Sequence, residues 1–149
     1  MVNPQINYSN ILLIKLQGLD YLGTSAEHEK KAKHDFDLSE SLLELKKHLD
    51  WCVVSLFYFA LHCVNSNARK NGITTFKPKP GEKATFHSKR RDYVSTNLTG
   101  FFTTYTRLYD YSRQCRYDPA YYLSLKYKTV ENLHRQTLFK AEQMYLFKK

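Results

Sequence analysis

The sequence predicts an all-α fold, an up-and-down antiparallel four-helix bundle over residues 25–149 preceded by an N-terminal extension of residues 1–24. Three observations predict this class. Apolar residues recur at helical spacing in four long stretches, and no stretch alternates apolar and polar residues as a half-buried strand does. The connections between the stretches are short or of medium length, which favours antiparallel neighbours.

The first helix is expected to run from Ser25 to the region of Lys46 to His48. Ser25 suits the N-cap, and Glu27 and Glu29 suit the positive end of the helix dipole. The residues expected to face the core share an approximate 3.6-residue spacing: Ala32, Phe36, Ser39, Leu43 and Leu45.

The second helix is expected from Trp51 to about Lys70, with Asp50 as its N-cap and Gly72 after its last turn. Its core stripe is Trp51, Val54, Phe57, Tyr58, Leu61, Val64 and Asn65. The opposite side is also apolar, so we expect this helix to be buried on more than one face.

Residues 71–90 are expected to form a loop, because Pro78, Pro80 and Gly81 prevent regular structure. This part of the chain is also the most basic. Residues 69–91 contain eight Lys and Arg against one Glu, a local net charge of +7.

A third helix is expected from Lys89 or Arg90 to about Gln114, although Gly100 weakens it by about 1 kcal/mol relative to Ala. Its core positions are Tyr93 or Val94, Leu98, Phe101, Tyr105, Leu108 and Ser112.

The pair Asp118-Pro119 then breaks the chain, since a residue before proline avoids the α region. Pro119 suits the first position of a final helix over residues 119–147. The apolar positions of that helix are Tyr122, Leu125, Val130, Leu133, Leu138, Ala141, Tyr145 and Leu146.

The net charge of +9 is unevenly distributed along the 149 residues. Residues 1–50 carry a net charge of −2, and residues 51–149 carry +11. Such asymmetry indicates a polyanionic partner, RNA or DNA, for the C-terminal two-thirds of the chain. The alternative is a solvated basic surface that serves solubility without any partner.

Several chemistries are excluded by missing motifs. The sequence has no Walker loop, no dinucleotide fingerprint and no GxSxG elbow, and its histidines and cysteines lack zinc spacing, so we expect no metal and no cofactor. The odd set of Cys52, Cys63 and Cys115 argues against disulfides and favours buried thiols. We expect a soluble, cytoplasmic protein with no membrane segment and reduced thiols.

The segment 109–122 carries the strongest functional signal. Arg113 and Arg116 lie three residues apart, so they project to one side of a helix, and tyrosines flank them. Guanidinium groups hold phosphate bidentately, and tyrosine stacks on bases, a combination that suits single-stranded RNA. The alternative is that these arginines pair with Asp110 or Asp118 to stabilise the joint between two helices.

Two further groups of residues contain histidine. Tyr58 and His62 lie one turn apart on the apolar second helix, where a core histidine bonded to an arginine or tyrosine of a neighbouring helix is the simpler interpretation. His87 begins the run His87-Ser88-Lys89-Arg90-Arg91 at the predicted entry to the third helix, where a phosphate would also meet free backbone N–H groups. A solvated loop end is the alternative there.

The sequence over residues 25–147 resembles the HEPN superfamily (higher eukaryotes and prokaryotes nucleotide-binding). The resemblance lies in the aromatic second helix, Asp-Trp-Cys-Val-Val-Ser-Leu-Phe-Tyr-Phe-Ala-Leu-His at 50–62. It continues through His87-x-x-Arg90 and through Ser112-Arg113-x-x-Arg116-Tyr117. The resemblance implies a helical bundle that forms a homodimer, with two copies of a polar motif around a shared cleft.

Many HEPN domains are metal-independent ribonucleases that use Arg-x4–6-His, and this chain departs from that motif. Tyr121 stands where the histidine is expected after Arg116, and tyrosine, with its pKa near 10, is a poor proton shuttle. His62 or His87 is the substitute that the sequence offers. The catalytic candidates are therefore Arg113, Arg116, Tyr121 and His62, and the RNA-binding candidates are His87, Lys89, Arg90, Arg91 and Tyr117.

Two functions are compatible with these residues. The first is RNA binding, with or without metal-independent cleavage, in a toxin–antitoxin or defence system. The second is a non-catalytic helical interaction module that partners another protein, such as a nucleotidyltransferase antitoxin. Arginines satisfied inside the protein would favour the second.

Overall fold

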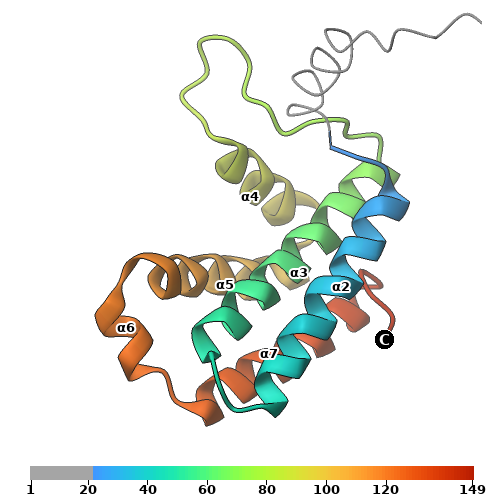
Figure 1. Cartoon of the computed structure of the whole chain (residues 1–149). Coiled ribbons are helices and arrows are strands. Elements are labelled where there is room, and N and C mark those ends of the chain that lie inside the picture. Colours follow the sequence, from blue (N-terminus) through green and yellow to red (C-terminus); the bar gives the residue numbers. More distant parts are fainter. Residues whose placement is uncertain (1–21) are drawn as a thin grey trace, which may run out of the picture.

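A computed structural model describes residues 22–149, and within this range the chain forms six helices and no strand (Figure 1). The helices are α2 (Ser25–Glu44), α3 (Leu49–Lys70), α4 (Phe86–Asn97), α5 (Thr99–Tyr117), α6 (Pro119–Ser124) and α7 (Tyr127–Gln143). The prediction of an all-α protein is confirmed. Of the predicted extension, residues 1–21 lie outside the described residues.

Helix α3 is the centre of the fold. It contacts α2, α4, α5 and α7, and in Figure 1 α2 lies beside it while α5 and α7 pass behind. Its length and apolar composition would suffice to cross a membrane, but 72% of its most apolar window is buried inside the protein. Such burial is typical of the core helix of a soluble protein.

The start of α2 and the turn into α3 differ from the prediction in detail. Thr24, rather than Ser25, caps α2, in a capping box with Glu27. The turn into α3 places Lys46 and His48 at positive φ, and His48 precedes the helix, so Asp50 lies in the first turn instead of capping it. The tight turn between the antiparallel helices α2 and α3 requires these positive φ angles. The N-cap preferences of single residues do not predict them.

The predicted third helix is wrong as a single rod, because the chain breaks at Leu98. Leu98 has φ −131° and ψ 49°, and it separates α4 from α5. A Cβ atom on Gly100 would lie 2.9 Å from the Sδ atom of Met144, so glycine allows the start of α5 to approach the chain after α7. The predicted core positions on both sides of the break are nevertheless buried: Tyr93, Val94, Leu98, Phe101, Tyr105, Leu108 and Ser112.

The predicted final helix is also two helices, α6 and α7, joined through an extended Leu125 and Lys126. Pro119 does begin α6, and the Asp118 carboxylate accepts from the backbone N–H groups of Ala120 and Tyr121. The helix ends before Tyr145, whose side chain is 95% exposed instead of buried.

An aromatic core lies between α2, α3 and α5, and the C-terminal tail closes one side of it. The Phe147 ring lies 5.3 Å from Phe36 and 4.9 Å from Phe59 between centroids. Cys52 and Cys63 are buried free thiols, and burial raises the pKa of Cys52 to about 12. Three residues predicted for the core of the first two helices are exposed instead: Leu45, Trp51 and Tyr58. Leu45 and Trp51 flank the turn between α2 and α3, and Tyr58 reaches the Arg116 guanidinium.

Candidate functional site

The candidate site lies where the start of α4 meets the C-terminal half of α5 over α3. The ring of His87, from α4, lies 5.1 Å from the ring of Tyr109, from α5. Tyr109 in turn lies 5.7 Å from Phe57, from α3. A capping box between Thr85 and Ser88 begins α4, and this fixes His87 in its first turn.

Two guanidinium groups border this aromatic cluster. The Arg113 guanidinium lies 5.7 Å from the centroid of the Tyr109 ring. Arg116 donates from Nε to the Ser112 carbonyl oxygen at 3.1 Å and from Nη1 to the Tyr58 hydroxyl at 3.5 Å. It also lies 5.2 Å from the centroid of Tyr117, an exposed ring. We call this set the basic aromatic face; its members are Tyr58, His87, Tyr109, Arg113, Arg116 and Tyr117.

Neither arginine of this face is paired with an acid. Among the ion pairs of residues 22–149, none involves Arg113 or Arg116. The Asp118 carboxylate instead caps α6. The interpretation in which these arginines pair with Asp110 or Asp118 is therefore wrong, and two uncompensated positive charges reach the surface together.

The electrostatic environment keeps His87 neutral. Partial burial lowers the pKa of its imidazole, and the positive charges of Arg90, Arg116 and Arg113 lower it further. A neutral imidazole at neutral pH has a free nitrogen that accepts a proton or a hydrogen bond. Among the described histidines, His87 is the one whose pKa is lowered by the charges of both Arg113 and Arg116.

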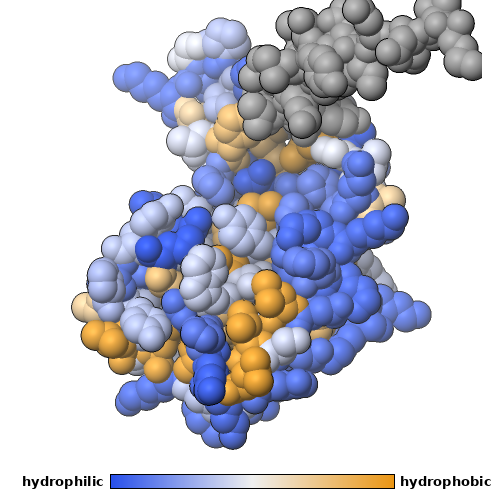
Figure 2. Space-filling model, viewed as in Figure 1, coloured by the Kyte–Doolittle hydropathy of each residue, from blue (hydrophilic) through white to orange (hydrophobic). Residues whose placement is uncertain are grey.

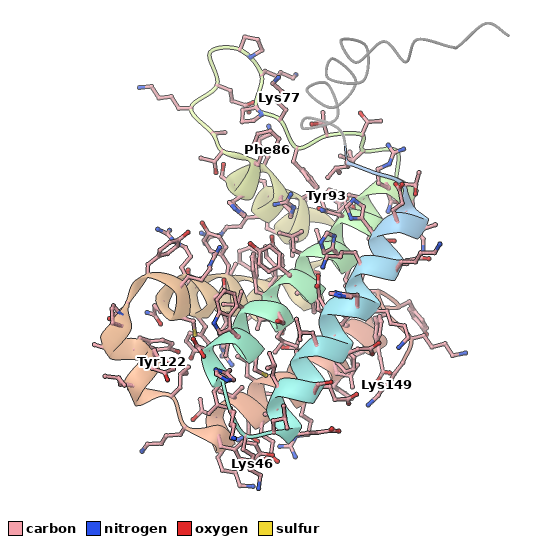
Figure 3. All side chains as sticks on the ribbon, viewed as in Figure 1. Lys46, Lys77, Phe86, Tyr93, Tyr122 and Lys149 are labelled. Atoms are coloured by element: carbon pink, nitrogen blue, oxygen red, sulfur yellow. The ribbon has the colours of Figure 1, made fainter. Side chains whose placement is uncertain are left out.

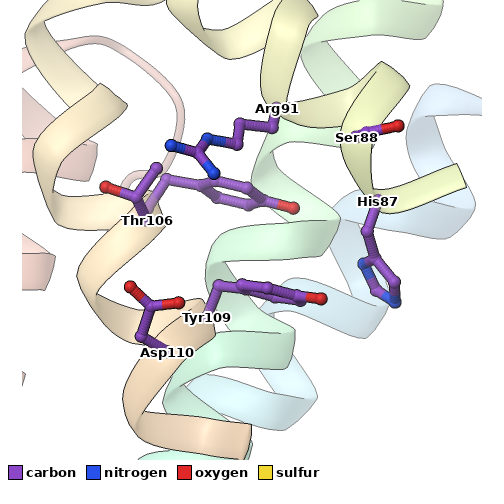
Figure 4. A pocket seen from close by; sticks show the side chains of 7 residues that line it. His87, Ser88, Arg91, Thr106, Tyr109 and Asp110 are labelled. Atoms are coloured by element: carbon purple, nitrogen blue, oxygen red, sulfur yellow. The ribbon is translucent and has the colours of Figure 1, made fainter. Parts of the chain in front are cut away.

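A small pocket of about 120 Å³ opens beside this face, between α4 and α5 (Figure 4). Its lining residues are His87, Ser88, Arg91, Tyr105, Thr106, Tyr109 and Asp110. In Figure 4, Arg91 enters from α4 and Asp110 from α5, with Tyr109 and His87 on a third side. The pocket therefore combines ring surfaces with groups of both charges.

The other basic candidates lie in different environments. Arg90 is only 7% exposed, donates from Nε to the Asn65 Oδ1 atom at 2.8 Å, and lies over the Phe76 ring, so it is not placed to contact RNA. Lys89 pairs with Glu82 at 2.7 Å. Arg91 is exposed and lines the pocket.

His62 belongs to a separate cluster between α3 and α2. Its Nδ1 atom lies 2.8 Å from Nδ1 of His28, and its Nε2 atom lies 3.8 Å from the Asp35 carboxylate. The expected arginine or tyrosine partner is therefore wrong, and the partner is a second histidine. Burial, followed by the charge of His28, lowers the pKa of His62 to about 4.

Tyr121 is not a proton shuttle in this structure. Its ring lies 6.1 Å from Tyr111, and burial raises the pKa of its hydroxyl to about 12. The structure thus groups Arg113, Arg116, Tyr117 and His87, and it places Tyr121 and His62 in other contacts.

The sequence reasoning missed Tyr105, Thr106 and Asp110 as pocket residues. Together with Tyr109 and Arg113 they recur at helical spacing on one face of α5, which is the signal that could have found them. A continuous helix from 89 to 114 would carry Arg91 and Thr106 to distant points of one rod. The break at Leu98 instead folds α4 against α5.

No group of three or more His, Cys, Asp or Glu side chains in the described part of the chain is arranged to hold a metal ion. Comparisons with protein-family models, with curated proteins and with solved structures gave no match, so the functional assignment depends on the geometry of this site alone.

Proposed function

We propose that this protein binds single-stranded RNA through the basic aromatic face, as a HEPN-like four-helix bundle whose helices are α2, α3, α5 and α7. One observation carries the proposal. Arg113 and Arg116 lie beside exposed rings and a neutral histidine, and no carboxylate among residues 22–149 forms an ion pair with either.

Each part of this face matches one part of a single strand. Unpaired guanidinium groups bind phosphate oxygens bidentately. Tyr58 and Tyr117 are accessible rings next to Arg116, and such rings stack on splayed bases. A duplex hides its bases, so the stacking surface favours a single strand.

The same residues fit metal-independent cleavage. Neutral His87 would take the proton of a ribose 2′-hydroxyl. The oxygen of that hydroxyl would at the same time form a bond to phosphorus. The bond from phosphorus to the 5′ oxygen breaks, and that oxygen takes a proton from water. The products are a 2′,3′-cyclic phosphate and a 5′-hydroxyl end, with Arg113 and Arg116 stabilising the charge on the transferred phosphoryl group.

The test uses labelled single-stranded RNA in EDTA with four proteins: wild type, Arg116→Ala, His87→Gln and Arg107→Ala. Arg107 is a matched control, an exposed arginine on the same helix with no partner among the described residues. We expect salt-dependent binding that Arg116→Ala weakens about tenfold and Arg107→Ala leaves nearly unchanged. We expect cleavage to require both Arg116 and His87.

The outcomes separate the possibilities. Binding without cleavage leaves a non-catalytic RNA-binding protein. Equal loss in Arg107→Ala and Arg116→Ala would mean that overall charge, and not this face, attracts RNA. Absence of binding even at low salt would overturn the proposal.

A second function is favoured by an exposed apolar end of the molecule. Trp51 is 57% and Leu123 81% exposed, and a groove there is lined by residues of the α2–α3 turn and of α6. Figure 2 shows hydrophobic residues over the ends of α2 and α3 and over α6, and Figure 3 shows Lys46 and Tyr122 at this end. Such a patch is typical of a protein interface.

We propose this end as the surface for a second copy of the chain or for a protein partner such as a nucleotidyltransferase antitoxin. Light scattering of wild type and of Trp51→Ala/Leu123→Ser tests it. A dimer that the double variant dissociates supports the interface. A monomer in both cases, with RNA binding intact, would remove the homodimer from the proposal.

A further inference from the structure

We propose that the pocket between α4 and α5 is a recognition site for one guanine base, formed by Arg91 from α4 and Asp110 from α5. This inference rests on the proposed function, because it names the base that the RNA-binding face selects. It adds a specificity site beside the phosphate-binding arginines.

Tyr105 supplies a buried wall of the pocket. It is only 2% exposed and lines the pocket. Its hydroxyl interacts with the neighbouring Arg90, which also donates from Nε to Asn65. The groups that a ligand can reach are therefore the exposed side chains at the mouth of the pocket.

The two charged walls of the pocket are unpaired. Arg91 and Asp110 both line it and are both exposed, yet neither forms an ion pair with any described residue. The Arg91 guanidinium lies 5.7 Å from the centroid of the Phe102 ring. A ligand between these walls must offer acceptors to the guanidinium and donors to the carboxylate.

Guanine meets this requirement better than the other three bases. Its O6 and N7 atoms are acceptors that arginine contacts bidentately. Its N1–H and exocyclic N2 amino group are adjacent donors for a carboxylate. Adenine has no O6 acceptor, cytosine has no N7, and uracil has a single ring N–H between two carbonyl groups, so each leaves one wall unsatisfied.

The rings complete the site and connect it to the arginines. Tyr109 and His87 line the pocket with their centroids 5.1 Å apart, and they provide apolar surface for a base. Arg113 lies over the same Tyr109 ring. A base in the pocket therefore places its own phosphate near Arg113, which makes base and phosphate one continuous site.

The experiment measures fluorescence anisotropy with labelled uridine nonamers that carry G, A, C or inosine at the central position. We expect the G-containing strand to bind wild type about tenfold more tightly than the others. Inosine, which lacks the 2-amino group, should lose much of this advantage. Asp110→Asn should abolish the difference between G and inosine, whereas Asp92→Asn, an exposed carboxylate on α4 outside the pocket, should keep it.

Arg116→Ala serves to separate the two proposals. It should weaken all four strands by a similar factor, because it contacts phosphate and not the base. Equal affinity of wild type for all four strands, with Arg116→Ala still weakening them, would overturn guanine recognition and leave RNA binding in place. Absence of binding to any strand at low salt would overturn both.

Discussion

The Nδ1 atoms of His28 and His62 lie 2.8 Å apart, so the two imidazoles join α2 to α3 through one hydrogen bond in which one ring donates and the other accepts. The accepting ring must be neutral for this bond, because two imidazolium rings would present two donors. Burial lowers the pKa of both histidines, and the charge of Arg90 lowers each further. The bond is thus a pH-sensitive part of the fold.

We therefore predict that acid destabilises the protein through this pair. The pKa of His62 is about 4 in the folded protein against 6.5 ordinarily, so the unfolded chain binds more protons below pH 6.5. The contribution of His62 to the free energy of unfolding is therefore complete above pH 6.5 and is lost as the pH falls towards 4. The total loss is on the order of 3 kcal/mol. Urea unfolding at a series of pH values measures it.

Replacement of the histidine should flatten this dependence. His62→Gln should show a smaller fall in unfolding free energy between pH 6.5 and 4 than wild type. His34→Gln changes an exposed histidine of the same cluster and should keep the wild-type slope. An unchanged slope in His62→Gln would show that other groups cause the acid sensitivity.

The buried Arg90 provides a second prediction. Its Nε atom donates to Asn65 Oδ1 at 2.8 Å, and the whole residue is 7% exposed. Asn65→Ala leaves a buried cation without this acceptor, so we expect a loss of about 2–3 kcal/mol of unfolding free energy. Thermal or urea unfolding measures the loss.

A double-mutant cycle checks the cause. Arg90→Met in the Asn65→Ala background should recover part of the loss, because it removes the unpaired charge. Asn132→Ala, at an exposed position on α7, should change stability by less than about 0.5 kcal/mol. A loss below that value in Asn65→Ala would contradict a structural role for the bond.

A third prediction links the cap of α4 to binding. Thr85 and Ser88 form the capping box that begins α4, and His87 and Arg91 follow within its first two turns. Thr85→Ala should cost about 1 kcal/mol of helix stability and lower RNA affinity severalfold without removing a contact to RNA. Hydrogen exchange over residues 85–91 and anisotropy report the two effects.

The matched variant is Thr24→Ala, which removes the same kind of cap from α2. It should cost similar stability and leave RNA affinity unchanged, because α2 supplies no residue to the basic aromatic face. If both variants weakened binding equally, general loss of stability would be the cause.

Local sequence signals were enough for the helical class and for most of the core. Phe36, Leu108 and Val130 are buried where their helical spacing predicts, and Arg113 and Arg116 share a surface as their spacing indicates. The break at Leu98 was not predictable in this way. Leucine favours helix, and the break depends on long-range packing, including the approach of Gly100 at the start of α5 to Met144 after α7.

The parts of the site that escaped prediction all depend on long-range contact. The His28 partner of His62 is 34 residues away in the sequence, and the pocket joins Arg91 to Asp110 only after the chain folds back at Leu98. Periodicity within one helix contains no information on which face of another helix it meets.

The break at Leu98 gives the two helices beside it different structural roles. The face of α5 towards α3 supplies buried bulk for the whole molecule, whereas α4 is a short arm that contributes one wall of a crevice. Exchanging exposed residues along that arm would change the wall of the crevice at little cost to the rest of the protein. The shape and charge of the crevice can therefore vary while the helices that carry it stay the same.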